Sequence, residues 1–293
     1  MGYGQHQSFY LRPHWIAKAI RMLEEDERFF YDSFGFEKIG LGKNMIKSLR
    51  FWTMAMNIVQ EERSIDTKQT VHRLTAFSKI LYEYDRFVRY PETAAILHYH
   101  LVSSPTQATT WYWFFNLFGE KAIVVQDLQE SLVSWVNQNE NKTVSTNSLK
   151  RDIDCLIKLY TAGKDESDDP EEVIQSPLHI LRLVEQKKGV VYKNSPSFEE
   201  IGITALLYTL LVYTQAREIT TVSVEEIQEA PRLWGKVFNM KRSEIVSALD
   251  ELTRHVKYPI SFVRTNRIDS VRLPDVDPLT LLTFEYGRKT VIL

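Results

Sequence analysis

The sequence predicts a mainly α-helical protein with short β hairpins, built from tandem modules of the winged helix-turn-helix type. Apolar residues recur at helical spacing along most of the 293 residues, whereas the alternation typical of a strand is clear only in 260–273. In each of three segments, a short helix, a turn and a second helix with basic residues near its start follow one another. This recurring order predicts the tandem modules.

The composition is that of an ordinary folded protein in a reducing compartment. Hydrophobic residues make up 44% and charged residues 25% of the chain, and the single cysteine, Cys155, rules out an internal disulfide and a cysteine-based zinc site. No apolar stretch is long enough to cross a bilayer, and the first residues lack the pattern of a secretory signal. We therefore expect a cytoplasmic protein without a membrane partner.

Two breaks divide the chain. Pro91 disfavours a helix at Tyr90 and suits the first turn of the next helix. Residues 165–172 hold six acids and one proline and cannot bury an apolar face. We predict an N-terminal helix-turn-helix-like domain at 1–90, a middle winged-helix-like domain at 91–164, an acidic linker at 165–175 and a C-terminal winged-helix-like domain at 176–293.

The first module contains the clearest candidate for a recognition helix. A short helix and a tight turn at about 32–42 precede a helix with a regular apolar stripe. That stripe consists of Met45, Leu49, Trp52 and Met56. Lys43, Lys47 and Arg50 lie on the opposite face and can neutralise DNA phosphates, while Asn44 is able to pair with adenine. The alternative is a solvated amphipathic helix without a partner.

The second module repeats this arrangement with weaker charge. Ser145 is the predicted N-cap of a helix with an apolar stripe. The stripe consists of Leu149, Ile153, Leu156 and Tyr160. The candidate DNA contacts on another face are Asn147, Lys150 and Arg151. Asp152 and Asp154 dilute the positive charge there, so a packed helix of mixed charge is favoured, and this module can be purely structural.

The third module starts from a predicted capping box at Ser223–Glu226. Asn239 is the predicted N-cap of a later helix. Its stripe consists of Ile245, Leu249, Leu252 and Val256. Lys241, Arg242 and Ser243 occupy the first turn, where cations oppose the helix dipole and favour an external anion.

A basic hairpin follows this helix at 260–273. Arg264 and Arg267 lie at or beside its predicted tip, and Arg272 lies on the return strand. These positions suit a wing that touches the DNA backbone or minor groove. Protection of a sheet edge against aggregation is the alternative interpretation of the same charges.

The sequence does not locate an active site. His98 and His100 cannot share a metal on one helix, because side chains two residues apart point about 200° apart. The aromatic run at 111–115 is expected to be mostly core rather than a platform for bases. A nuclease-like pattern at 185–187 is rejected, because 178–188 has helical spacing and the upstream acids lie in the linker.

Three stretches of the chain resemble a known family. Residues 40–52, the aromatic residues 111–113 and the opening residues 9–15 are similar to a bacterial family first catalogued as a domain of unknown function. That family resembles the SspB component of single-stranded DNA phosphorothioation systems. The resemblance implies a place in an anti-phage pathway beside a cysteine desulfurase, an ATPase and an ATP-pyrophosphatase-like sulfur transfer protein. It also implies nicking of DNA for sulfur incorporation, without assigning catalytic residues.

We therefore expect DNA as a partner, and Mg²⁺ or Mn²⁺ as the cofactor if the protein nicks DNA. No nucleotide or haem cofactor is expected, because Gly42 and Lys43 lack the further glycine and the Ser or Thr of a phosphate-binding loop. A stand-alone winged-helix transcription regulator and a non-catalytic adaptor of the modification complex remain as alternatives.

Overall fold

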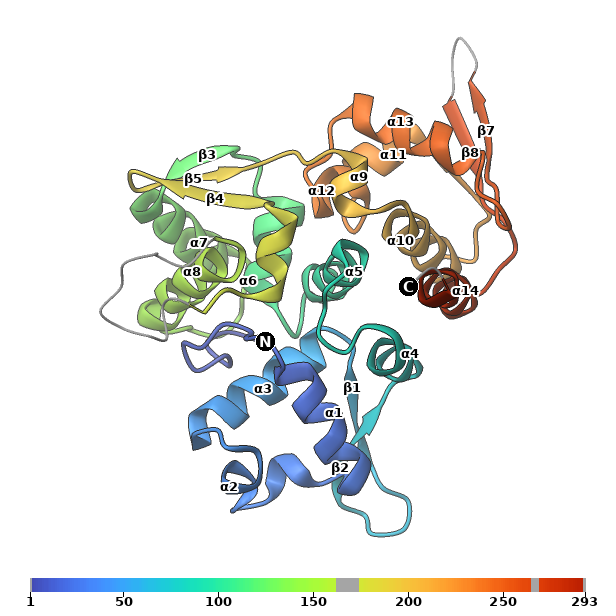
Figure 1. The fold of residues 1–293 in the computed structure, drawn as a ribbon. Coiled ribbons are helices and arrows are strands. Elements are labelled where there is room, and N and C mark those ends of the chain that lie inside the picture. The colour runs from blue at the N-terminus through green and yellow to red at the C-terminus, as the bar shows by residue number, and fades with distance from the viewer. Residues whose placement is uncertain (1, 162–173, 265–268, 292–293) are drawn as a thin grey trace.

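The computed structural model describes residues 2–161, 174–264 and 269–291. Its first third is a group of helices followed by a hairpin and one further helix (Figure 1). In chain order these are α1 (Trp15–Glu25), η1 (Phe29–Tyr31), α2 (Gly35–Ile39), α3 (Lys43–Ala55), β1 (Val59–Arg63), β2 (Thr70–Leu74) and α4 (Ala76–Asp85). The predicted short helix, turn and second helix of this segment are therefore present.

The middle of the chain again places helices before a hairpin. It contains α5 (Pro91–Val102), α6 (Thr109–Tyr112), the π-helical turn η2 (Trp113–Leu117), β3 (Ala122–Val124), α7 (Val125–Asn139), α8 (Thr146–Tyr160), η3 (Pro177–Leu181), β4 (Val184–Lys187) and β5 (Val190–Lys193). Pro91 occupies the first turn of α5, as its fixed backbone angle predicts.

The last third repeats the order once more. It contains α9 (Phe198–Ile201), α10 (Ile203–Gln215), β6 (Thr221–Ser223), α11 (Val224–Glu229), α12 (Trp234–Val237), α13 (Arg242–Leu252), β7 (Ser261–Arg264), β8 (Asp269–Arg272) and α14 (Pro278–Val291). The chain turns between α9 and α10 at Gly202, where a side chain would meet Glu92 of α5 and where φ is +91°.

In the described part of the chain, the strands form three small antiparallel sheets. β1 pairs with β2, β5 lies between β3 and β4, and β8 lies between β6 and β7. The second sheet joins Ile123 to Val191, so it connects residues on both sides of the predicted acidic linker. The protein is thus mainly α with short β elements, as predicted, and the sheets hold hairpins onto the helices.

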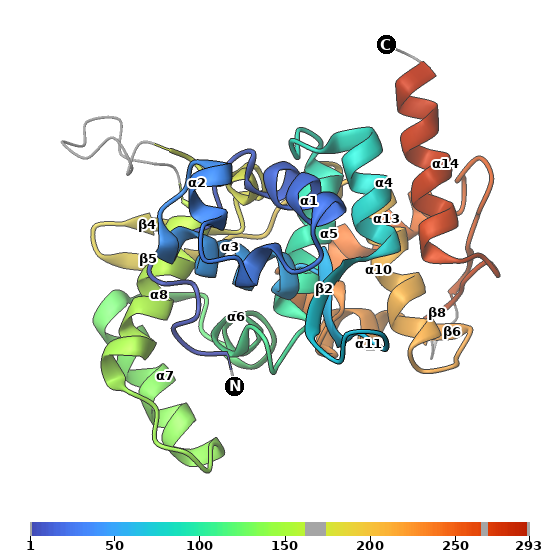
Figure 2. The same cartoon turned by 90° about the horizontal axis from the view of Figure 1, so that it is seen from below.

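Helix α5 lies at the centre of the molecule, and the view from below in Figure 2 also places it among the other helices. Nine of its twelve residues are buried, and it contacts α3, α6, α9, α10 and η3. A helix that is apolar on all sides must be enclosed on all sides. The helix therefore ties the three parts of the chain to a common core.

Polar side chains on α5 are hydrogen-bonded inside that core. His98 Nε2 lies 2.7 Å from the Val237 carbonyl oxygen, so it carries the proton and donates. Nδ1 of the neutral ring then accepts from the Tyr160 hydroxyl at 2.7 Å. His100 contacts the Tyr208 hydroxyl at 2.9 Å instead. The two imidazoles have different partners, as their spacing on the helix predicts.

Several sequence-based expectations about local structure are wrong. Residues 178–188 do not form one helix, because the 3₁₀ helix η3 ends at Leu181 and β4 begins at Val184. Hairpins at 59–74 and 184–193 escaped detection, since exposed and buried residues do not alternate along β1 or β4. The predicted N-cap Asn239 is replaced by Lys241, and its side-chain amide instead donates to the Leu183 carbonyl oxygen.

Two further details differ from expectation. Helix α13 ends at Leu252, so Val256 is not part of its stripe and is 70% exposed. Ser223 caps α11 by accepting from the Glu226 amide, but the Glu226 carboxylate accepts from the Tyr213 hydroxyl and does not close the box. Tertiary partners outcompete the local motif here. The aromatic run at 111–115 is buried except for the half-buried Tyr112, as predicted.

No helix within the described residues is both long and apolar enough to span a bilayer.

Acidification should destabilise the protein through its buried histidines. Burial lowers the pKa of His98 to about 3 and that of His100 to about 4, from an ordinary value of 6.5. Between pH 6.5 and the pKa of the folded protein, the unfolded chain binds more protons than the folded chain. The free energy of unfolding therefore falls as the pH drops below about 6.5. Urea denaturation across a pH series measures this slope.

The variant H98Q tests the assignment. Removing this imidazole should make the acid-dependent slope shallower by up to one proton, whatever the change in overall stability. The variant H100Q provides the same readout if H98Q does not fold. A slope that is unchanged in both variants would contradict the role of these histidines.

Candidate nucleic-acid interface

The start of α3 is an exposed basic surface, as predicted. Gly42 is the extended residue before the helix, and Lys43, Asn44 and Lys47 are exposed on its first two turns. The opposite side is held in place because the Trp52 indole and the Ser48 hydroxyl both donate to the Phe9 carbonyl oxygen at 3.0 Å. The buried face fixes which side chains of α3 face solvent.

Arg50, the fourth predicted contact of this helix, is engaged within the fold. Its guanidinium forms an ion pair with Glu61 of β1, and its Nε donates to His72 Nε2 of β2 at 3.0 Å. The Arg50 guanidinium also lies over the Tyr31 ring, 5.2 Å from its centroid. Arg50 therefore links α3 to the hairpin, and its charge is largely balanced by Glu61.

His72 is held in its neutral form by this arrangement. Burial and the positive charge of Arg50 lower the pKa of His72 to about 4, although Glu61 acts in the opposite direction. A neutral ring leaves Nε2 free to accept the Arg50 hydrogen bond. Lys47, Arg50 and Glu61 line a cavity of about 560 Å³ beside the loop that carries Gln107.

The predicted contacts on α8 lie at its exposed start. Asn147, Lys150 and Arg151 are exposed, and the Arg151 guanidinium donates within its own helix to Asn147 O at 3.4 Å and Ser148 Oγ at 3.3 Å. Ser145 is the N-cap as predicted, although its side chain does not accept a backbone hydrogen bond.

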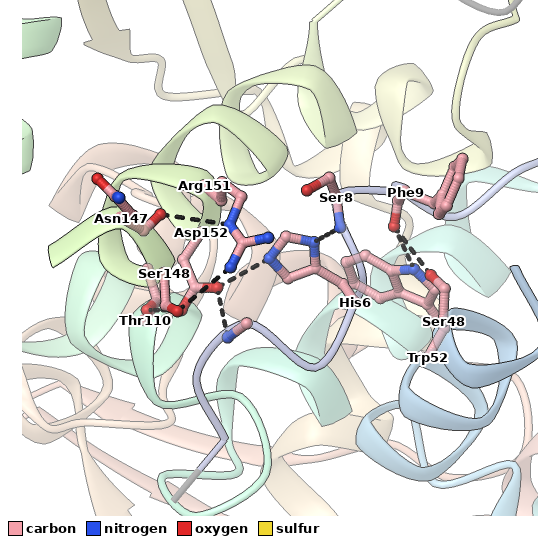
Figure 3. A network of polar contacts seen from close by, with 11 residues as sticks. His6, Ser8, Phe9, Ser48, Trp52, Thr110, Asn147, Ser148, Arg151 and Asp152 are labelled. Atoms are coloured by element: carbon pink, nitrogen blue, oxygen red, sulfur yellow. Dashed lines mark hydrogen bonds and ion pairs between the residues drawn. The ribbon is translucent and has the colours of Figure 1, made fainter. Parts of the chain in front are cut away.

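Asp152 does not dilute the charge of this surface, contrary to expectation, because its side chain is fully buried. Its carboxylate accepts from the Gly4 amide at 2.8 Å, from the His6 ring at 2.8 Å and from the Thr110 hydroxyl at 2.7 Å (Figure 3). His6 Nδ1 accepts the Ser8 amide, so Nε2 is the donor to Asp152. The carboxylate anchors the N-terminal segment between α6 and α8.

The basic elements of the third module are partly paired. Arg242 Nη2 of α13 lies 3.0 Å from Asp269 Oδ2 of β8. Lys241 and Ser243 are exposed at the start of α13. Arg264 and Arg272 are exposed on β7 and β8. Arg267 falls outside the described residues. Figure 1 shows this hairpin projecting from the helices.

These surfaces do not all merge into one patch. Figures 1 and 2 place α3 and α13 on different sides of the central helix α5. The α3 start and the α13 start with its hairpin are therefore separate exposed sites. Any nucleic acid that contacts both of them has to span the surface between them.

The residues that the structure describes contain no group of three or more His, Cys, Asp and Glu side chains that could hold a metal ion. Asp168 and Asp169 of the rejected nuclease-like pattern lie outside these residues. No metal ligands are assigned, and no catalytic step is derived through a metal.

Comparison with known proteins assigns the chain to a family. The sequence profile of a family described as a protein of unknown function, DUF4007, matches residues 3–284. The chain belongs to the DUF4007 family. This assignment agrees with the resemblance carried by residues 40–52 and 111–113.

Solved structures of SspB share the fold of this DUF4007 chain. A magnesium ion-bound SspB crystal structure has a TM-score of 0.86, and a further SspB crystal structure has a TM-score of 0.85. Each is 22% identical to the chain, and each alignment covers 99% of this chain and 87% of the SspB chain. No curated protein matches the sequence significantly. At this identity, the likeness establishes the fold alone.

Sequence reasoning missed the partners that decide which cations of this DUF4007 chain remain exposed. Glu61 and His72 belong to a hairpin without a clear alternating pattern, and Asp269 pairs with Arg242 from 27 residues away. Four of the five residues of β1 are exposed, so the strand lacks the alternation of buried and exposed residues that predicts a strand from sequence.

The variant R50M should raise the pKa of His72 above its value of about 4, because the largest neighbouring positive charge is removed. Nuclear magnetic resonance of the imidazole measures this pKa directly. K47M is the matched control, since it removes an exposed cation from the same helix. An unchanged His72 pKa in R50M would show that Arg50 does not act on this histidine.

Proposed function

We propose that the chain is a DNA-binding component of a bacterial anti-phage DNA phosphorothioate modification system. The observation that carries this proposal is the exposed basic start of α3, on a fold shared with SspB over 99% of the chain. Lys43 and Lys47 would contact phosphates, and Asn44 would face a base edge in the major groove.

The order of the elements supports tandem winged-helix modules. In the last third, α10, β6, α11, α13 and the β7–β8 hairpin follow one another, and the return strand β8 lies at the centre of its sheet. The middle third gives the same order with α6, β3, α7, α8 and the β4–β5 hairpin, and again the return strand is central. A helix followed by a hairpin wing is a DNA-docking arrangement.

The first third supports the same interpretation in a reduced form. It has α1, α2, α3 and the β1–β2 hairpin, without a third strand among the described residues. Because Arg50 binds Glu61 in the middle of β1, the orientation of the hairpin relative to α3 is fixed. A fixed wing beside a basic helix is suited to gripping a duplex backbone.

The first test is a gel shift with duplex DNA across a salt series. The variant K43Q/K47Q should weaken binding and flatten the dependence of log K on log salt by about two units, because each phosphate contact contributes about 0.9. The control K79Q/K121Q removes two exposed lysines outside the predicted surfaces and should keep the slope.

An unchanged slope in K43Q/K47Q would overturn the proposed role of α3. Weaker binding in K79Q/K121Q of equal size would show that only overall charge matters. Footprints and sizing on the same complex also separate this function from a dimeric transcription regulator, which would select a palindrome.

We further propose that the protein nicks DNA beside a cysteine desulfurase, an ATPase and an ATP-pyrophosphatase-like sulfur transfer protein. The magnesium ion bound in one of the SspB crystal structures motivates the choice of metal. Mg²⁺ or Mn²⁺ would activate water and stabilise the leaving oxygen.

A supercoiled plasmid should therefore relax to the nicked circle when the protein and Mg²⁺ or Mn²⁺ are present, and should stay supercoiled when EDTA is added. Agarose gels measure the conversion. The assay is run with the protein alone and with the partner proteins. Absence of nicks under every one of these conditions would reject the nicking role and leave the DNA-binding role to the gel shift.

A further inference from the structure

A second cavity lies away from α3, where four segments of the chain meet. It has a volume of about 700 Å³, within the range of small-molecule sites. Pro13 precedes α1, residues 87–91 connect α4 to α5, residues 175–182 contain η3, and Glu200 lies in α9. None of the predicted DNA contacts lines this cavity.

Two arginines on different segments line the cavity without acidic partners. Arg89 and Arg182 are exposed, and among the described residues neither has a carboxylate within ion-pair distance. Glu200 is the one acid among the lining residues, and its carboxylate accepts from the Ser197 amide at 2.8 Å in a capping box. The positive charge of the cavity is therefore open to an external anion.

The backbone of the loop that carries Arg89 is held in place by a buried carboxylate. Asp85 accepts from the Arg89 amide at 2.8 Å and from the Tyr90 amide at 3.0 Å. Val88, which lies between Asp85 and Arg89 in the chain, has a φ of +54°, which is rare for a β-branched residue. The loop is thus constrained in an unfavourable backbone conformation that presents Phe87 and Arg89 to the cavity.

The second arginine lies close to a histidine of the preceding short helix. Arg182 follows η3 in a left-handed backbone conformation, and its amide donates to the His179 carbonyl oxygen at 3.0 Å. Burial and the Arg182 charge lower the pKa of His179 below 6.5. The imidazole is therefore neutral at pH 7 and can share a hydrogen bond with a phosphate oxygen.

The remaining wall is mostly apolar. Beside the polar Gln175 and Ser176, its residues are Pro13, Phe87, Val88, Pro91, Pro177 and Ile180. Phe87 is half-buried, and the Arg86 and Arg89 guanidiniums lie 5.1 and 5.6 Å from its ring centroid. Rigid proline rings and an aromatic ring beside cations are suited to a planar, electron-rich base.

A larger cavity of about 1130 Å³ provides the contrast. It is lined by Trp113 and Trp135, but its one cation, Lys121, is outnumbered by three acids that repel a phosphate: Glu120, Asp127 and Glu130. Aromatic surface and positive charge therefore coincide at the Arg89–Arg182 cavity and not at this one.

We propose that the Arg89–Arg182 cavity binds a nucleotide, with the two arginines on its phosphate and Phe87 with the prolines against its base. The inference goes beyond the proposed duplex-binding surface and does not rest on it. The nucleotide can be free or can be the 5′-phosphorylated end of a DNA strand, and both share the same phosphate and base chemistry.

Calorimetry tests the pocket by measuring how tightly the full chain binds inorganic phosphate, ribose 5-phosphate and dAMP. Affinity should rise in that order. The variant R89Q/R182Q should weaken dAMP binding by about a hundredfold, since each charged hydrogen bond contributes about one power of ten. F87L should weaken dAMP by about tenfold and leave inorganic phosphate unchanged.

R21Q is the matched control, because it removes an exposed arginine of α1 that does not line the cavity. Thermal melting of each variant verifies that it folds. K43Q/K47Q should bind dAMP as the unmodified chain does, so failure of the duplex surface and failure of the pocket give different patterns.

Oligonucleotides distinguish the two sources of the ligand. A 5′-phosphorylated single strand that binds more tightly than its charge-matched 3′-phosphorylated counterpart, with the difference lost in R89Q/R182Q, identifies a DNA end as the ligand. Equal binding of the two strands together with arginine-dependent dAMP binding identifies a free nucleotide. If dAMP fails to bind and the unmodified chain binds both strands equally, or if R89Q/R182Q binds every ligand as the unmodified chain does, the proposal is overturned.

Discussion

The burial of α5 is the constraint on which the rest of the structure depends. Nine of its twelve residues are inaccessible to solvent, so every polar group on it needs a partner inside the protein. His98 reaches Tyr160 of α8 and the Val237 carbonyl oxygen of α12, and Thr93 contacts the Tyr286 hydroxyl of α14 at 2.7 Å. The same helix thus positions elements from the middle and the end of the chain, and its contact with α3 extends this to the beginning.

Charge is divided between the interior contacts and the exposed surfaces. The carboxylate of Asp152 is hydrogen-bonded to the N-terminal segment, while Glu61 forms an ion pair with Arg50 and Asp269 forms one with Arg242. Each pairing removes a charge that a reading of the sequence would assign to the surface. Among the many cations that stay exposed are those at the helix starts and at the Arg89–Arg182 cavity, on a chain with a net charge of -2. Local placement, and not overall charge, gives this protein surfaces that suit polyanions.

The three hairpins, which follow helices in the same order in each part of the chain, make different contacts with the rest of the protein. The second sheet joins strands from both sides of the predicted linker, whereas the third sheet projects with its own arginines. The first hairpin is tied to its helix by an ion pair and a buried histidine. One architecture therefore serves anchoring in the middle of the chain and exposes basic surface at its two ends.

The sequence by itself determined the helical elements and much of their burial. Apolar stripes at helical spacing located α3, α8 and α13. Proline in the first turn of α5 and serine before α8 marked helix starts, because their backbone preferences act over only a few residues. These features depend on local geometry, which a sequence states directly.

Tertiary structure alone decided which polar residues meet. Asp152 resembles a surface acid on its helix until residues near the N-terminus fold over it, and Arg50 resembles a free cation until β1 brings Glu61 to it. The cavity between Arg89 and Arg182 joins four segments whose sequences show no shared motif. Long-range packing is set by the whole core, so pairing and cavities follow from the enclosure of α5 and not from the spacing of any one segment.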